Sequence, residues 1–200
     1  MTIYALKPRF QSLLRPLAGA VARAGVTANQ VTVAAAVVSV ALGAFVALRA
    51  PERWPFLLIP AWMFVRMAFN AIDGMLAREF GQKSRLGAYL NELTDVVSDA
   101  ALYLPFAFVA PFSPLWTGVV IVLAVISEYA GVLGPLAGAS RRYDGPLGKS
   151  DRAFAFGALG LWVGLSAKLP DWAAWAMPAL AALLVVTIVN RVRAGLAEAS

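Results

Sequence analysis

The sequence predicts an all-α membrane protein, a polytopic bundle of six transmembrane helices preceded by an amphipathic juxtamembrane helix. Three observations predict this class. Of the 200 residues, 60% are hydrophobic and only 14% are charged, a balance that is unusual for a soluble domain of this length. The apolar residues fall into six runs, and basic residues gather between alternate runs. The length allows one domain, so we assign residues 1–200 to a single membrane domain.

The first 25 residues predict an amphipathic helix that lies on the membrane. Basic residues interrupt the apolar ones, which excludes the uninterrupted apolar core of a signal peptide. These basic side chains are placed to meet anionic lipid headgroups. An orientation signal and a role in guiding substrate are equally open readings of the segment. The apolar residues at helical spacing are Tyr4, Leu6, Phe10, Leu13, Leu14, Leu17 and Val21, and the basic ones are Lys7, Arg9, Arg15 and Arg23.

Six apolar runs follow within residues 28–193, each close to or above the length of about 20 residues that crosses the hydrocarbon core. Glycines dilute the fifth run, although small residues at such spacing also let helices pack closely in lipid. The runs cover residues 28–49, 53–80, 86–110, 114–138, 151–168 and 172–193.

The distribution of charge predicts the orientation in the membrane. Most basic residues fall in the N-terminal segment, around residue 80, between residues 141 and 152, and at the end of the last run. By the positive-inside rule, both termini and these loops are cytoplasmic, in a bacterial inner membrane. The net charge of +6 follows these loops, so it does not predict nucleic-acid binding. Neither histidine nor cysteine occurs, which leaves carboxylates, amides and hydroxyls for chemistry.

Polar residues in the second and third runs form the candidate site. On helices, Asn70, Asp73 and Ala77 share one face, and a second face carries a ladder of polar residues at four-residue spacing. Ionisable groups at membrane depth are costly, so they indicate a working site. Carboxylate and amide oxygens suit Mg2+ or Mn2+, which in turn binds substrate phosphates. The ladder consists of Gly87, Asn91, Asp95 and Asp99.

These residues carry a resemblance to a known family. The chain contains the motif D-G-x-x-A-R, then eight residues, then G-x-x-x-N-x-x-x-D. This order resembles the signature of the CDP-alcohol phosphotransferase family, which is D-x-x-D-G-x-x-A-R-x8-G-x-x-x-D-x-x-x-D. Asn70 and Asn91 replace its first and third acids, as in the YnbA-like bacterial inner-membrane subgroup, which the chain resembles over nearly its whole length. The matching residues are Asp73, Gly74, Ala77, Arg78, Gly87 and Asp95.

The resemblance implies a metal-dependent enzyme of phospholipid biosynthesis. It implies transfer of a phosphatidyl group from CDP-diacylglycerol, or another CDP-alcohol, to a hydroxyl acceptor with release of CMP. Asp95 would be the base, and the protein would be a homodimer among membrane lipids. Metal ligands would be Asn70, Asp73, Asn91, Asp95 and, as a compensating acid, Asp99. Residues expected at the nucleotide and pyrophosphate are Asn29, Thr32, Asp73, Gly74, Ala77, Arg78 and Gly87.

The two asparagines keep an oxygen but each removes a negative charge. We therefore expect weaker metal binding, with one tight metal and one supplied with the substrate. Asp99, one turn beyond Asp95, is better placed to compensate than Glu92.

Other polar groups have both a functional and a structural interpretation. Thr27 and Asn29 begin the first run, where simple helix capping is favoured over nucleotide binding. The basic loop before the fifth run is expected to bind a phosphate of the acceptor or lipid, and positive-inside topology is the alternative. Arg66 is expected to offset the acidic cluster, and Glu128 to face the bundle in a pair. The expected phosphate-binding residues are Arg141, Lys149, Arg152 and Arg191.

Three alternatives remain beside this interpretation. A catalytically weakened member would bind CDP-lipid and serve a regulatory or partner role. A cation transporter would explain the carboxylates, but it gives no reason for the spacing of Gly74, Arg78 and Gly87. A polar seam that only joins helices is disfavoured, because small residues and neutral amides suffice for that purpose.

Overall fold

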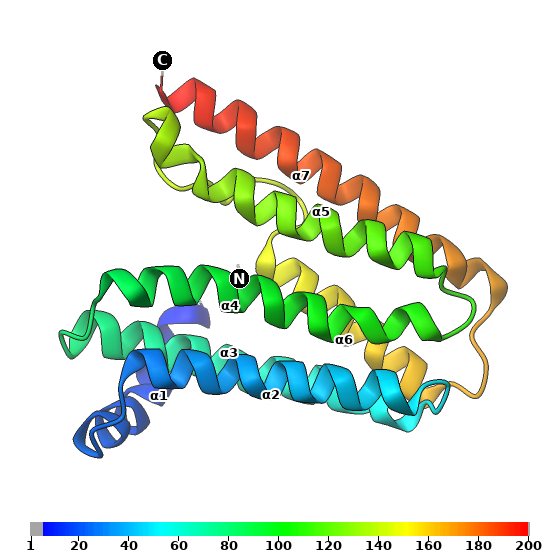
Figure 1. Cartoon of the computed structure of the whole chain (residues 1–200), viewed down its shortest axis with the longest axis horizontal. Helices are drawn as coiled ribbons and strands as arrows, with labels where there is room; N and C mark the ends of the chain where they lie inside the picture. The colour runs from blue at the N-terminus through cyan, green and yellow to red at the C-terminus, as the bar shows by residue number, and fades with distance from the viewer. Residues whose placement is uncertain (1–5, 200) are drawn as a thin grey trace.

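The computed structural model describes residues 6–199, and helices make up most of this range (Figure 1). The start of the predicted amphipathic segment, with Tyr4, lies outside the described residues. The long helices are α1 Leu6–Arg23, α2 Ala28–Arg49, α3 Leu58–Glu79, α4 Arg85–Tyr103, α5 Pro114–Val132, α6 Lys149–Leu165 and α7 Ala176–Ala199. Short 3-10 helices are η2 Trp54–Leu57, η3 Leu104–Phe108, η4 Gly134–Ala137 and η5 Asp171–Trp175.

Local capping groups determine where the helices begin. The Thr27 hydroxyl accepts a 3.2 Å hydrogen bond from the Gln30 backbone N–H, and the Gln30 side chain accepts one of 2.8 Å from the Thr27 N–H. This capping box starts α2 and confirms the structural interpretation of Thr27. Ser84 caps α4 in the same way, through a 2.9 Å bond from the Gly87 N–H.

In two predicted runs the α-helix gives way to a 3-10 helix before the run ends. The run 86–110 divides at Tyr103, where α4 gives way to η3 with Pro105 in its first turn. The run 114–138 divides at Val132, before η4 and Pro135. Proline has no N–H to donate within a helix, so the regular α-helix ends there and each run continues as a short 3-10 helix.

Four helical segments are long and apolar enough to cross a membrane: Ala28–Arg49, Trp54–Glu79, Pro114–Val132 and Asp171–Ala199. The helices of the other two predicted spans, α4 and α6, carry much of the charge of the candidate site, and α6 has only 17 residues. The all-helical class is confirmed for residues 6–199. The prediction that six helices cross the membrane stays a prediction.

The helices run up and down between two ends of the molecule (Figure 1). At one end lie α1, the α3–α4 turn and the end of α7, and at the other lie the turns that join α2 to α3, α4 to α5 and α6 to α7. Helix α2 packs against both α3 and α4, whereas α3 and α4 make few backbone contacts with each other. The polar faces of α3 and α4 are therefore joined by side chains rather than by close helix packing.

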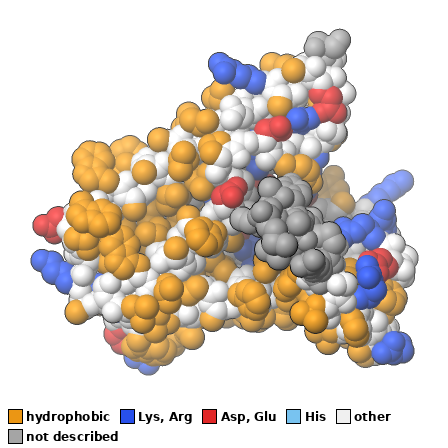
Figure 2. All heavy atoms as spheres, turned by 180° about the vertical axis from the view of Figure 1, so that it is seen from behind, with side chains coloured by type: hydrophobic (Ala, Val, Ile, Leu, Met, Phe, Trp, Pro, Cys, Tyr) orange, Lys and Arg blue, Asp and Glu red, His pale blue; other side chains and the backbone are white. Residues whose placement is uncertain are grey.

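Hydrophobic side chains lie both inside and outside the bundle. Tyr103 stacks on Phe156 with ring centroids 3.7 Å apart, and Phe106 packs edge-on against Phe156. Figure 2 shows hydrophobic side chains over much of one outer face, with charged groups concentrated toward the ends. Exposed side chains such as Leu48 and Leu115 suit lipid rather than water.

Candidate active site

Asp73 on α3 is held by the first turn of α2. Its carboxylate is buried, and the Thr32 hydroxyl donates a 2.7 Å hydrogen bond to Oδ2. A further contact fixes the same junction, because the Gln82 side chain of the α3–α4 turn accepts a 2.7 Å bond from the Ala28 N–H. The role of Gln82 is not predictable from the sequence, since a helix cap from a distant turn leaves no local pattern.

Arg66 joins α3 to α4 through two ion pairs. Its guanidinium contacts Oδ1 of Asp95 at 3.0 Å and Oδ1 of Asp99 at 2.6 Å. Only 5% of Arg66 is exposed, so these two carboxylates supply the counter-charge that a buried guanidinium requires. The expectation that Arg66 offsets the acidic cluster is confirmed.

Asp95 is paired on both oxygens. Arg66 holds Oδ1, and the Lys149 ammonium at the start of α6 contacts Oδ2. The two partners differ in freedom, because the Arg66 side chain is 6% exposed and that of Lys149 is 36% exposed. Arg66 is thus a fixed partner of Asp95, and Lys149 is an exchangeable one.

The structure brings together several signature residues. Asp73 lies within electrostatic reach of both Asp95 and Lys149. Asn70, one turn before Asp73, is half-buried, and Asn91, one turn before Asp95, is exposed. Asp99 points instead toward Arg66 and Arg152, with both of its oxygens paired.

The donor set agrees in type with a hard divalent cation. It offers the carboxylates of Asp73 and Asp95 and the amide oxygens of Asn70 and Asn91, and oxygen donors are what Mg2+ and Mn2+ prefer. Within residues 6–199, no group of three or more acidic side chains is placed to hold a metal ion by itself. Amide or substrate oxygens would have to complete the coordination.

The glycines of the signature lie beside polar side chains. A Cβ on Gly74 would lie 2.8 Å from Nη2 of Arg78, and a Cβ on Gly87 would lie 2.8 Å from Oδ1 of Asn29. The two glycines therefore leave space for Arg78 to fold back along α3 and for Asn29 to approach α4. Ala77 packs at the edge of the apolar cluster beneath α1.

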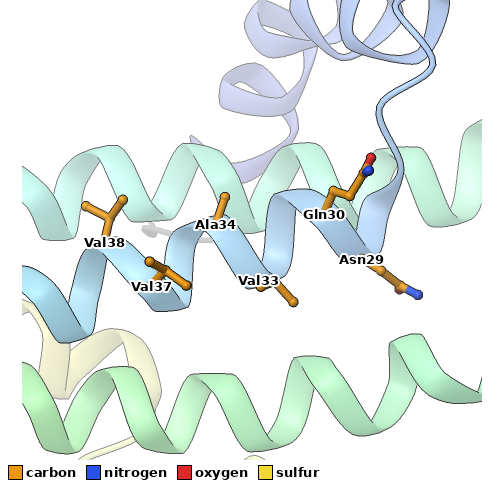
Figure 3. Close-up of a pocket in the computed structure, with 6 residues that line it drawn as sticks. All are labelled: Asn29, Gln30, Val33, Ala34, Val37 and Val38. Carbon is orange, nitrogen blue, oxygen red and sulfur yellow. The ribbon is translucent and has the colours of Figure 1, made fainter.

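A shallow, open surface depression lined by α2 alone begins at Asn29 and follows this helix. Figure 3 shows its six residues along this helix, with Asn29 and Gln30 at one end and Val37 and Val38 at the other. The polar end thus lies next to Gly87 of the signature, and the remainder of the lining is apolar.

The basic residues expected at a phosphate separate into two groups. Lys149 contacts Asp95, whereas Arg141, Arg152 and Arg191 all contact Glu128 on α5. Glu128 is buried and paired, as expected. The sequence gives no indication of which cations it meets.

Comparison with known proteins identifies the family. The family model described as CDP-alcohol phosphatidyltransferase matches residues 25–189. The chain belongs to the CDP-alcohol phosphatidyltransferase family. It is therefore a transferase of this class, as the signature resemblance implied.

Relatives within this family extend over nearly the whole chain. The inner membrane protein YnbA of Escherichia coli (strain K12) is 44% identical over 196 residues, which cover 96% of each chain. The phosphatidylinositol phosphate synthase of Mycolicibacterium smegmatis is 30% identical, covering 92% of this chain and 84% of the relative.

A solved structure of this family shares the fold. The phosphatidylinositol phosphate synthase of Mycobacterium tuberculosis with CDP-DAG bound is 25% identical to this chain, with a TM-score of 0.73 over 90% of this chain and 92% of the other. The same enzyme has also been solved in complex with manganese and citrate, with a TM-score of 0.73 and coverage of 90% and 87%.

Proposed function

We propose that this family member transfers a phosphatidyl group from CDP-diacylglycerol to an alcohol, with release of CMP, in phospholipid biosynthesis. The observation that carries the proposal is the junction of α2, α3 and α4, where Thr32 holds Asp73 and Asp95 lies nearby between Arg66 and Lys149. A relative of the same fold binds CDP-DAG, which supports this choice of donor.

Asp95 is the proton acceptor in this proposal. Lys149, the exposed partner, moves from Asp95 to a substrate phosphate, and Oδ2 is then free to receive the proton of the acceptor hydroxyl. Arg66 stays in place and keeps the carboxylate oriented. The hydroxyl oxygen bonds to the phosphorus that carries diacylglycerol, the bond from this phosphorus to the bridging oxygen breaks, and CMP leaves.

Mg2+ or Mn2+ would be held by Asn70, Asp73, Asn91 and Asp95, and would neutralise the charge of the pyrophosphate. The manganese in the relative and the oxygen donors present here support this assignment. We do not extend it to Asp99, because both of its oxygens are paired with buried arginines, whereas the Lys149 partner of Asp95 is 36% exposed and can leave. The nucleotide and its phosphates would be surrounded by Asn29, Thr32, Gly74, Ala77, Arg78 and Gly87.

The membrane arrangement completes the proposal. The protein crosses a bacterial inner membrane six times as a homodimer, with α1 on the membrane surface, and with the site and both termini in the cytoplasm. The basic loops at the site end and the inner-membrane relative support this orientation. There a water-soluble acceptor and a lipid donor both reach the site.

The direct test is CMP release from CDP-diacylglycerol by the purified protein with a panel of alcohols. Asp95→Asn and Asp73→Asn preserve the shape of each side chain, and we expect both to reduce turnover by at least about a thousandfold if these carboxylates act in the transition state. Lys83→Gln, in the exposed α3–α4 turn, is a matched control. Full activity of both aspartate variants would overturn the proposal.

A second candidate rests on Asn70 and Asn91. With two signature acids replaced by amides, the chain would bind CDP-lipid and regulate another protein without transferring the phosphatidyl group. Saturable binding of CDP-diacylglycerol without CMP release, over a panel of acceptors and metals, would favour this candidate.

A further inference from the structure

Three guanidinium groups converge on Glu128 deep in the bundle. Oε1 of Glu128 lies 2.8 Å from Nη2 of Arg152 and 3.4 Å from Nη1 of Arg191, and Oε2 lies 3.5 Å from Nη2 of Arg141. Arg152 and Arg191 are almost fully buried, with 1% and 2% exposed. Three convergent guanidiniums form a typical anion-binding arrangement, and here the anion is a side chain of the protein itself.

The rest of this cluster holds the arginines in place independently of Glu128. Arg152 also donates 3.3 Å bonds to the Ser127 hydroxyl and the Leu147 carbonyl. Arg191 donates to the Ser127 carbonyl. Arg152 and Arg191 therefore keep acceptors even without the Glu128 charge, so the buried part of the anion-binding arrangement is built into α5, α6 and α7.

This cluster is continuous with the proposed base. Arg152 contacts Asp99 at 3.3 Å, Asp99 contacts Arg66 at 2.6 Å, and Arg66 contacts Asp95 at 3.0 Å. The cavity beside Asp99, Tyr103, Glu128 and Arg152 has only about 10 Å³, the space of one water molecule. A phosphate could enter only if the Glu128 side chain moved aside, and the ion pairs of Glu128 with Arg152 and Arg191 oppose that movement.

We infer that Glu128 determines acceptor specificity and that the acceptor alcohol carries no phosphate group. A phosphate monoester has about two negative charges at pH 7, and it would have to displace a carboxylate that is already paired with all three arginines. In a buried site, the repulsion between the acceptor phosphate and the Glu128 carboxylate disfavours a phosphorylated acceptor. The inference rests on the proposed function, and it separates this chain from relatives that are named phosphatidylinositol phosphate synthases.

The wild-type enzyme tests the inference without any substitution. CMP release is measured with two matched pairs of acceptors, glycerol against glycerol 3-phosphate and myo-inositol against inositol 3-phosphate. In whichever pair supports CMP release, we expect the kcat/KM of the unphosphorylated alcohol to be at least about tenfold higher than that of its phosphorylated counterpart. Preference for the phosphorylated member would overturn the inference while leaving phosphatidyl transfer intact.

Glu128→Gln tests the assigned residue. We expect this variant to shift the acceptor ratio toward the phosphorylated member by about tenfold or more, because the arginines lose their internal anion. Glu92→Gln is the matched control, since Glu92 contacts Arg141 at the exposed edge of the same network, and its ratio should stay near that of the wild type. An unchanged ratio in Glu128→Gln would overturn the assignment.

A binding measurement separates this inference from the proposed reaction. Inorganic phosphate should raise the Tm of Glu128→Gln more than that of the wild type, whether or not either protein releases CMP. Equal stabilisation of both proteins by phosphate would overturn the role of Glu128. Absence of CMP release with every acceptor would overturn the proposed transfer, and the phosphate measurement would then decide the role of Glu128 alone.

Discussion

The hydroxyl of Thr32 on α2 donates a 2.7 Å hydrogen bond to Oδ2 of Asp73 on α3. This bond joins the start of the first apolar helix to the most buried carboxylate of the family signature. It leaves the carboxylate in one orientation, since the Asp73 side chain sits almost entirely inside the bundle. A hydrogen bond to a charged group contributes about 1.5–3 kcal/mol, so this one is strong enough to influence catalysis.

Replacing Thr32 should therefore lower activity without unfolding the protein. Thr32→Val keeps the shape and removes the hydroxyl, and we expect kcat/KM for CMP release to fall by about 10- to 100-fold. Thr32→Ser retains the hydroxyl and should stay close to the wild type. Wild-type kinetics in Thr32→Val would show that the orientation of Asp73 does not depend on this bond.

Arg66 should be essential for stability. Arg66→Gln leaves Asp95 and Asp99 without their shared buried partner, and breaking a buried pair in this way costs about 3–5 kcal/mol. We expect a clearly lower Tm in detergent. Adding Asp99→Asn should recover part of this loss, because it removes one of the two carboxylate charges that Arg66 balances.

Arg15→Gln is the control for this prediction. Arg15 pairs with Glu79 at 2.9 Å, but both side chains are well exposed, and exposed ion pairs contribute little to stability. Its Tm should stay near that of the wild type. Equal losses from Arg15→Gln and Arg66→Gln would contradict the role assigned to burial.

Periodicity and the signature predicted the helices and the faces on which Asp73 and Asp95 lie, because both depend on local spacing. Pairing partners were less predictable. Arg66 was expected to offset the acids, since it lies one helical turn before Asn70 and two before Asp73. The meeting of Glu128 with Arg191, 63 positions away, depends on which helices become neighbours. Hydropathy likewise identified α2, α5 and α7 as apolar. Helix α4 carries charged residues of the candidate site, so hydropathy does not identify it as a membrane span and its crossing of the membrane stays a prediction.

Restoring the two missing acids should strengthen metal binding. Asn70→Asp and Asn91→Asp each return a negative charge to the proposed donor set, and metal affinity rises with ligand charge. We expect the Mn2+ concentration for half-maximal CMP release to fall by about tenfold in the double variant. Asn70→Ala should change it in the opposite direction. If neither change moves the titration, these side chains do not bind the metal.

The loop before α6 should respond to pH through Asp144. The Arg142 guanidinium donates to this carboxylate at 2.9 Å and holds the pKa of Asp144 below its usual value. A carboxyl whose pKa is lowered by folding stabilises the protein above its unfolded pKa, and this stabilisation is lost as pH falls through the folded value. The Tm difference between wild type and Asp144→Asn should thus be greatest near pH 7 and shrink below about pH 4. A difference that stays constant with pH would contradict this pairing.

Gly43 should be required for the contact between α2 and α4. A Cβ at this position would overlap the backbone carbonyl of Ala101, and neither helix backbone can move aside as a flexible side chain would. Gly43→Ala should therefore separate the helices that hold Thr32 and Asp95, at a cost of about 1–3 kcal/mol, with a lower Tm and lower CMP release. Gly118→Ala on α5 is the matched control, because nothing lies within 4 Å of the added methyl and alanine favours the helix. An equal effect of the two substitutions would mean that the loss comes from glycine flexibility rather than from the close approach of α2 to α4.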